Sequence, residues 1–375
     1  MNYYKNVYVK GYAQLNLGDD LFLDILFKRY PDVLFYIECA DHVYEKFLSK
    51  YPNVKCILND NFFYSRVLNS FKRRFLPALW NKNKEYHFRK VLDNVDSVIV
   101  IGGSMYMQHS LDLEKDYDIS FYRFRNTFFS DKPIFFLGGN FGPFLTNDYV
   151  EAYSEIFKNA KDVCFRDEYS YNIFKDVNNR VRFNPDIVFS YQINVQENLE
   201  PESVGFSIVS PTKSKSNIDI EAYIQKYADI VQVFVDKNYI VKLFSFCKDE
   251  GDEEIIEKIS SKIIINDKFH KIFYDGDIPE FLREFASVDT VFCGRFHSLI
   301  LAMLFNQKIV PVSYSNKMKN ILKDLSYSEL VLDMEGLISL SVNGVAEISS
   351  RNYDITKAKD NAVRHFEKLD DYLIR

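Results

Sequence analysis

The chain has 375 residues, of which 47% are hydrophobic and 27% are charged. This length exceeds the roughly 250–300 residues at which one hydrophobic core stops growing, so we expect two domains, and the composition excludes a mainly disordered chain. The formal net charge of -6 argues against a protein that follows nucleic-acid phosphates, because such a protein needs a basic face.

The N-terminal sequence, MNYYKNVYVKGYAQ, lacks the uninterrupted apolar run of a signal peptide. No stretch reaches the roughly 18 consecutive apolar residues that indicate a membrane-spanning helix. We therefore expect a cytoplasmic protein.

Short apolar runs alternate with helical patterns from the start of the chain, which is typical of a parallel sheet built from βαβ units. Helical patterns cover residues 19–28 and 41–50. The strands expected in this first half are residues 6–9, 33–38, 54–57, 97–101, 134–137 and 163–165. We place the first domain at residues 1–193.

A polar stretch, QINVQENLEPES, covers residues 192–203 and predicts an exposed linker. A second domain is expected over residues 204–345, with strands and helices in alternation again. Its strands are predicted at residues 204–208, 240–244, 290–293 and 309–312, and its helices at residues 221–235, 253–260, 278–285 and 298–305. The sequence thus predicts two doubly wound, Rossmann-like α/β domains that face a cleft. An apolar stripe predicts a C-terminal helix within residues 354–375, which we expect to pack back on the first domain.

Two basic motifs each lie between an expected strand and an expected helix. Arg295 and His297 follow the strand that ends at Cys293, and Arg166 follows another apolar run. Phosphate groups bind at helix N-termini, and a desolvated arginine requires an anionic partner. For Arg166, an ion pair with Asp167 is as reasonable as a substrate contact. The histidines form no pair with metal-ligand spacing, so no metal site is predicted.

Glycine-containing turns follow three more of the expected strands. The first, around Asn16 and Gly18, has neither of the glycine spacings typical of nucleotide-binding loops. Asp19 or Asp20 is expected to cap the next helix, either as a plain cap or with its carboxylate near the cleft. The other turns contain Gly102, Gly103 and Ser104, and then Asn140. Ligands bind at the carboxyl ends of parallel strands, where glycine lets the backbone approach them closely.

Residues 66–84 alternate apolar side chains with basic ones between Arg66 and Lys84. This pattern fits an interfacial helix in peripheral contact with anionic lipid at the inner face of the membrane. A packed surface helix with basic edges, interrupted at Pro77, fits it equally well.

Taken in order, the motifs resemble those of the polysaccharide pyruvyl transferase family. The matching pieces are Asn16-Leu17-Gly18-Asp19-Asp20, Gly102-Gly103-Ser104, Asn140-Phe141-Gly142-Pro143, Arg166-Asp167-Glu168-Tyr169-Ser170, Pro185-Asp186, Arg295-Phe296-His297-Ser298 and Tyr314-Ser315-Asn316-Lys317. The resemblance implies a GT-B-like fold, with an acceptor-side N-terminal domain and a donor-side C-terminal domain. It also implies phosphoenolpyruvate as donor and a sugar or lipid-linked oligosaccharide of capsule or exopolysaccharide biosynthesis as acceptor.

The chemistry of phosphoenolpyruvate suggests roles for these residues. Its carboxylate and phosphate need fixed cations, which Arg166 and Arg295 supply. His297 is the candidate general acid, and Asp19 or Asp20, across the cleft, is the candidate base. Lys317 is expected to assist the departing phosphate, and no cofactor or metal is needed. The remaining candidate substrate-binding residues are Asn16, Gly18, Gly102, Gly103, Ser104, Asn140 and Ser298.

Two other functions fit the same residues. A GT-B glycosyltransferase would use a nucleotide sugar and release a nucleotide, and a non-catalytic relative would bind glycans without turnover.

Overall fold

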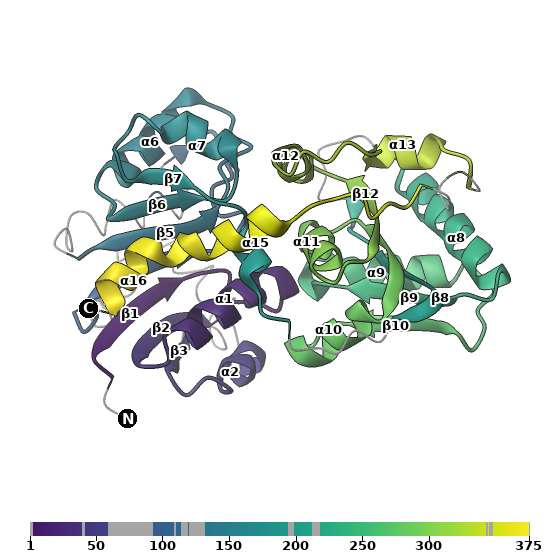
Figure 1. Cartoon of the computed structure of the whole chain (residues 1–375), viewed down its shortest axis with the longest axis horizontal. Helices are drawn as coiled ribbons and strands as arrows, with labels where there is room; N and C mark the ends of the chain where they lie inside the picture. Colours follow the sequence, from purple (N-terminus) through teal and green to yellow (C-terminus); the bar gives the residue numbers. More distant parts are fainter. Residues whose placement is uncertain are drawn as a thin grey trace, which may run out of the picture. The chain divides into compact units, whose positions relative to one another are not determined.

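The computed structural model describes residues 3–39, 42–58, 93–108, 110–113, 119, 132–193, 199–211, 218–342, 344 and 348–374. Residues 66–84, where the sequence suggested a lipid-facing helix, lie outside this part. Two compact units make up the chain (Figure 1). Unit 1 consists of Met1–Gln14, Phe22–Asn184 and Val363–Arg375, and unit 2 consists of Leu15–Leu21 and Pro185–Ala362. The units therefore divide before the linker expected at residues 192–203, and the short segment Leu15–Leu21 belongs to unit 2.

Unit 1 is built on a parallel sheet of seven strands in the order β3-β2-β1-β4-β5-β6-β7. The order reverses between β1 and β4, which is where ligands approach a doubly wound sheet. The strands are β1 (Lys5–Lys10), β2 (Val33–Cys39), β3 (Val54–Leu58), β4 (Ser97–Ile101), β5 (Ile134–Gly139), β6 (Asp162–Phe165) and β7 (Val181–Phe183).

Alternate residues of β5 bury their side chains on opposite faces of this sheet, as the two-residue period of a strand requires. Phe136 packs against Phe157 with ring centroids 5.0 Å apart, and Phe135 packs against Tyr372 with centroids 5.4 Å apart. The helices of unit 1 are α1 (Leu17–Arg29, whose first residues belong to unit 2), α2 (His42–Leu48), α6 (Asn147–Lys158), α7 (Glu168–Phe174), η5 (Val363–Phe366) and α16 (Glu367–Leu373).

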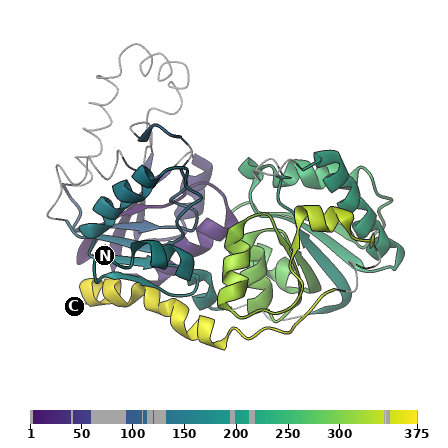
Figure 2. The ribbon, with the colours of Figure 1, turned by 90° about the horizontal axis from the view of Figure 1, so that it is seen from above.

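The C-terminal helix α16 lies along the sheet of unit 1, as Figures 1 and 2 show. Arg29 donates from Nε to Asp370 at 3.0 Å and from Nη2 to the same carboxylate at 2.6 Å, and the Tyr30 hydroxyl donates to it at 2.7 Å. Arg182 donates to the backbone oxygens of Arg364 and His365 at 2.7 and 2.8 Å. These contacts attach the last turns of the chain to unit 1.

Unit 2 repeats the doubly wound pattern with six parallel strands in the order β10-β9-β8-β11-β12-β13. Here the order reverses between β8 and β11. The strands are β8 (Glu200–Ser207), β9 (Ile240–Ser245), β10 (Phe269–Phe273), β11 (Val288–Cys293), β12 (Lys308–Ser313) and β13 (Leu332–Asp333). The helices are η2 (Ile187–Ser190), α8 (Ile220–Asp236), η4 (Lys248–Glu250), α9 (Asp252–Ser260), α10 (Ile278–Ala286), α11 (Phe296–Leu304), α12 (Asn316–Asp324), α13 (Met334–Ser339) and α15 (Thr356–Ala362).

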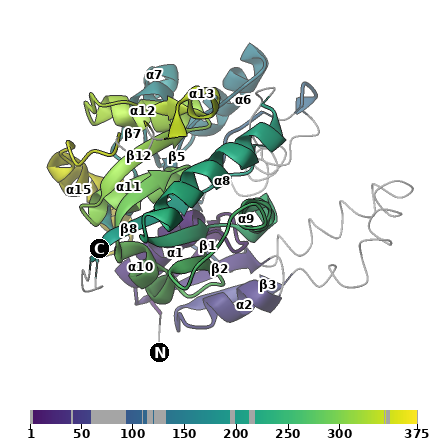
Figure 3. The same ribbon diagram turned by 90° about the vertical axis from the view of Figure 1, so that its right-hand side faces the viewer.

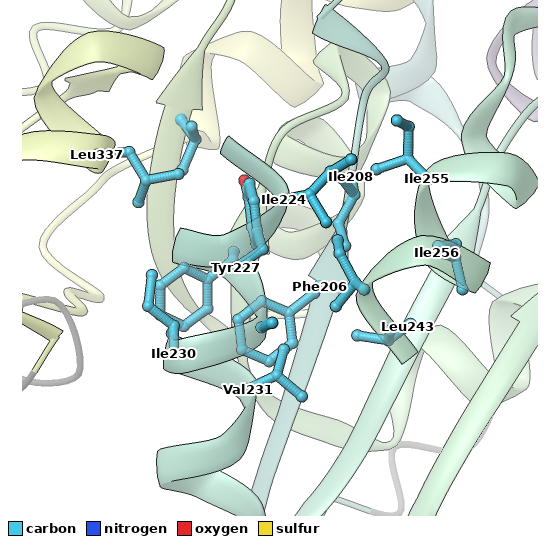
Figure 4. Packing of buried hydrophobic residues seen from close by; sticks show 14 of the residues in the cluster. Phe206, Ile208, Ile224, Tyr227, Ile230, Val231, Leu243, Ile255, Ile256 and Leu337 are labelled. Atoms are coloured by element: carbon cyan, nitrogen blue, oxygen red, sulfur yellow. The ribbon is translucent and has the colours of Figure 1, made fainter. Parts of the chain in front are cut away.

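The core of unit 2 lies on both faces of its sheet. On one face, Phe206 and Leu243 pack in a cluster with side chains of α8, α9 and α13 (Figure 4). Figure 3 shows α8 running across this face. On the other face, Phe244 packs against Phe285 of α10 with ring centroids 5.1 Å apart. Each fully buried side chain of this size contributes on the order of 1.5–3 kcal/mol to folding.

The predicted α/β class and the parallel, doubly wound sheets are confirmed. The sequence missed β7, β10 and β13, which are all edge strands. Edge strands are short or partly exposed and lack the continuous apolar run of a central strand. In β10, for example, His270 and Lys271 are exposed. Among the described residues, no helix has the length and apolar content that crossing a bilayer requires.

Candidate active site

The junction between β11 and α11 contains the first predicted basic motif. The Gly294 N–H donates to the Ser207 carbonyl at 2.8 Å, and the Arg295 N–H donates to Ser207 Oγ at 3.3 Å. A methyl group at position 294 would lie 2.3 Å from the Ser207 carbonyl oxygen, so only glycine fits there. These contacts fix the junction against the end of β8, at the point where the strand order reverses.

Arg295 has its anionic partners within unit 2. Arg295 is 7% exposed. Its guanidinium donates from Nε to Asp252 at 3.0 Å and makes further hydrogen bonds to Asp252 and Glu250. Burial alone would lower the pKa of Arg295, but the two carboxylates raise it well above its ordinary value. The sequence argument expected a substrate anion as this partner. In the structure the protein itself supplies two carboxylate partners, and a contact between Arg295 and the substrate stays a prediction.

The segment Leu15–Leu21 brings the start of α1 to the same site. The Leu17 N–H donates to the Phe246 carbonyl at 3.1 Å, and Asn16 Oδ1 accepts from the Gly18 N–H at 3.1 Å. Asn16 is therefore the helix cap that the sequence had assigned to Asp19 or Asp20. Those two carboxylates occupy the first turn of α1. They belong to the same unit as His297, which replaces the expectation that they act from across a cleft.

The two aspartates differ in environment. Asp20 is fully buried and accepts a hydrogen bond from the Tyr274 hydroxyl at 2.8 Å. Asp19 is only half-buried. Asp19 thus has the more accessible carboxylate of the pair.

His297 is packed between α1 and η2. A methyl group at Gly18 would lie 1.9 Å from His297 Nδ1, so the imidazole rests against the bare backbone of this glycine. On its other side, Nε2 lies 3.9 Å from Asp186 Oδ2. Asp186 is fully buried, and its Oδ1 caps η2 by accepting from the Val188 N–H at 2.9 Å.

Two more predicted residues belong to unit 2. Ser298 lies in the first turn of α11, and Lys317 lies at the junction between β12 and α12. The Ser298 hydroxyl is buried and donates to the Arg295 carbonyl at 2.6 Å, so it stabilises the first turn of α11. The contact of Ser298 with substrate stays a prediction. Lys317 is half-buried in the first turn of α12, at the carboxyl end of β12.

Unit 1 contains a second group of predicted residues, at the carboxyl ends of three adjacent strands. Arg166 follows β6, is 5% exposed and donates from Nη2 to Asn140 Oδ1 at 2.6 Å. The Asn140 N–H donates to the Gly103 carbonyl at 2.9 Å, and a methyl group at Gly103 would lie 2.5 Å from Arg166 Nη1. Gly102 precedes this contact with a φ of 149°, and Ser104 follows it and is exposed.

Asp167, which the sequence offered as an ion partner for Arg166, caps α7. Its Oδ1 accepts from the Ser170 N–H at 2.7 Å, and Ser170 Oγ in turn accepts from the Phe141 N–H at 2.7 Å. These bonds hold the Arg166 junction against the turn that contains Asn140.

The structure thus gathers the predicted residues into two groups, one in each unit. The group in unit 2 also contains residues to which the sequence analysis gave no role, namely Asp186, Tyr274, Asp252 and Glu250. Asp186 was present in a motif, but as a helix cap it is indistinguishable from many other aspartates. Within the described ranges, His, Cys, Asp and Glu form no group of three or more that could hold a metal ion.

Known proteins share sequence features with this chain. A family model described as polysaccharide pyruvyl transferase matches residues 16–316. The amylovoran biosynthesis protein AmsJ of Erwinia amylovora is 19% identical over 286 residues, which are 69% of this chain and 68% of AmsJ.

Solved structures share the fold at low sequence identity. HepE of Anabaena, in complex with UDP and glucose, has a TM-score of 0.55 at 12% identity and is matched over 99% of both chains. The UDP-GlcNAc 2-epimerase of Methanocaldococcus jannaschii has a TM-score of 0.59 at 10% identity, with 98% of this chain and 99% of the epimerase covered. These likenesses confirm the GT-B-like fold. Because the family model spans most of the chain, this protein belongs to the polysaccharide pyruvyl transferase family.

Proposed function

We propose that this protein transfers the pyruvyl group of phosphoenolpyruvate to two hydroxyls of one sugar in a polysaccharide precursor, forming a cyclic ketal and releasing phosphate. The observation that carries the proposal is the placement of His297 in the first turn of α11, packed on the Gly18 backbone and close to a buried carboxylate. Family membership supplies the reaction class.

The reaction needs a proton donor at the methylene carbon of phosphoenolpyruvate. Protonation there makes the adjacent carbon electrophilic, and a sugar hydroxyl adds to it. The C–O bond to phosphate then breaks, and a second hydroxyl of the same sugar closes the ketal. The two sugar hydroxyls lose one proton each. One of these protons replaces the proton that the acid gave to the methylene carbon, and the other leaves with the phosphate. His297 is the proposed donor, because imidazole exchanges protons near neutral pH.

A base has to take the proton of the attacking hydroxyl. The structure distinguishes the two aspartates that the sequence left as equals. Asp20 is buried, and its carboxylate accepts a hydrogen bond from the Tyr274 hydroxyl. Asp19 is half-buried at the start of α1. We therefore assign proton abstraction to Asp19 and a positioning role to Asp20.

The anionic groups of the donor need cations and N–H donors. In unit 2 we assign this task to Lys317 and to the N-terminal turns of α11 and α12, where backbone N–H groups and the helix dipole favour phosphate. In unit 1, Arg166 is a second proposed substrate-binding group, because Asn140 and the contact with Gly103 orient its guanidinium. Arg295 acts indirectly in this scheme, by holding the loop after β9 against the junction that contains His297.

Direct assay tests the proposal. The protein is incubated with phosphoenolpyruvate and a panel of candidate glycans, and the products are examined by mass spectrometry and a phosphate assay. We expect the mass gain of a 1-carboxyethylidene group together with equimolar phosphate. Release of a nucleotide from a nucleotide sugar, with phosphoenolpyruvate left intact, would instead establish a glycosyltransferase.

Gly103→Ala tests the Arg166 group. The added methyl group would lie 2.5 Å from Arg166 Nη1, so the guanidinium has to move away from its position beside Asn140. Misplacing a binding group by about 1 Å can cost on the order of 10²-fold in rate, and we expect a loss of this size in kcat/KM for phosphoenolpyruvate. Steady-state kinetics measure the loss, and thermal unfolding checks that the variant is folded. Unchanged kcat/KM would remove Arg166 from donor binding.

A further inference from the structure

The two carboxylate oxygens of Asp186 have different neighbours, the backbone of η2 and the His297 ring. Oδ1 accepts a hydrogen bond from the Val188 N–H at 2.9 Å and so caps η2. Oδ2 lies 3.9 Å from His297 Nε2. Because Asp186 is fully buried, water screens its charge poorly, and the attraction between this carboxylate and a protonated imidazole is stronger than it would be at the surface.

The opposite side of the His297 ring is also defined. Gly18 presents only backbone to Nδ1, and a side chain there would overlap the ring at 1.9 Å. The Asn16 cap and the bond from the Leu17 N–H to the Phe246 carbonyl hold this glycine in place. The imidazole is therefore confined between the backbone of α1 and the carboxylate of η2.

The charged groups on the surrounding elements account for the local electrostatics. Arg295 precedes His297 on the same junction, and its positive charge is matched by Asp252 and Glu250. The first turn of α1 contributes Asp19 and Asp20, of which Asp20 accepts the Tyr274 hydroxyl. Asp186 is the carboxylate of η2. Arg295 is thus paired with carboxylates of its own, and Asp186 is the carboxylate that lies 3.9 Å from the imidazole Nε2.

We propose that Asp186 is a positioning residue that, opposite the Gly18 backbone, orients His297 and stabilises its protonated form. The inference rests on the proposed function in one respect, namely that protonated His297 is the acid of the reaction. The geometry that orients the ring is independent of which reaction the site performs.

The test is a titration of His297 in the full-length protein by NMR, followed through the imidazole Hε1 resonance. The resonance is assigned as the one that His297→Gln lacks. In Asp186→Asn the amide retains the ability to cap η2 but carries no charge. We expect the midpoint of the His297 titration to move to lower pH by roughly one unit, because an opposite charge at this distance favours the protonated ring.

Asp219→Asn is the matched control. Asp219 is also a helix cap of unit 2, accepting from the Glu221 and Ala222 N–H groups, and the substitution is chemically the same. We expect no change in the His297 midpoint there. A midpoint that stays unchanged in Asp186→Asn, or that shifts equally in both variants, would overturn the inference.

Kinetics link the inference to the reaction. If the wild type transfers pyruvyl groups, the alkaline limb of its pH profile should move to lower pH in Asp186→Asn, since the imidazolium loses its carboxylate. Gly18→Ala should lower kcat by displacing the ring, with folding checked by thermal unfolding. If the NMR shift is observed but no transfer occurs, the positioning role stands and the proposed function fails. If pyruvyl transfer occurs but Asp186→Asn changes neither the alkaline limb of the pH profile nor the titration midpoint of the His297 resonance, the positioning role is wrong.

Discussion

Arg295→Ala is expected to lower the free energy of unfolding by about 3–5 kcal/mol, the cost of removing one partner from a buried ion pair. Without the guanidinium, Asp252 remains fully buried with its charge uncompensated, and Glu250 loses its ion pair with Arg295. Asp252 also accepts from the Phe246 and Cys247 N–H groups at 3.0 and 3.1 Å, so it cannot simply turn toward water. Urea denaturation followed by far-UV circular dichroism measures the loss, and hydrogen exchange of peptides from β9 and β11 localises it to unit 2.

Arg283→Ala is the control for this substitution. Arg283 also pairs with a glutamate in unit 2, but its side chain is 60% exposed. Surface pairs of this kind contribute less than about 1 kcal/mol. The double variant Arg295→Met with Asp252→Asn should recover part of the loss, because it removes both buried charges. If Arg295→Ala is no more destabilising than Arg283→Ala, the fold does not need Arg295 to compensate the charges of Asp252 and Glu250. A direct role of Arg295 in binding the donor then gains support.

His297→Gln is expected to reduce kcat for pyruvyl transfer by about 10²–10⁴-fold, the usual contribution of a positioned general acid. Glutamine keeps polar atoms near Asp186 but cannot supply a proton near neutral pH. The affinity for phosphoenolpyruvate should change little, since the anion contacts proposed in this unit are Lys317 and backbone N–H groups. Single-turnover kinetics separate the chemical step from binding, which isothermal titration calorimetry measures.

His270→Gln serves as the matched control, because His270 lies exposed on edge strand β10 of the same unit. We expect wild-type turnover from this variant. Wild-type turnover from His297→Gln as well would show that another group supplies the proton.

The runs of apolar residues in the sequence were enough to predict the central strands of both sheets. Strands such as β4 and β5 are buried along their whole length, so they need continuous apolar runs that are visible in the sequence. Edge strands such as β10 have one side without a neighbouring strand, and their mixed composition carries no equally clear signal. The limits of prediction therefore follow from where each strand lies in its sheet.

The sequence by itself determined that glycines, Arg166, Arg295 and His297 lie at strand–helix junctions, because hydrophobic periodicity locates those junctions and parallel strands place their carboxyl ends on one edge. Only the tertiary structure decided that Asp252 and Glu250 neutralise Arg295, that Leu15–Leu21 belongs to the unit of His297, and that Asp186 lies beside its ring. These are contacts between residues tens to hundreds of positions apart. No local pattern encodes which carboxylate a buried cation meets, because that depends on how the strands and helices pack.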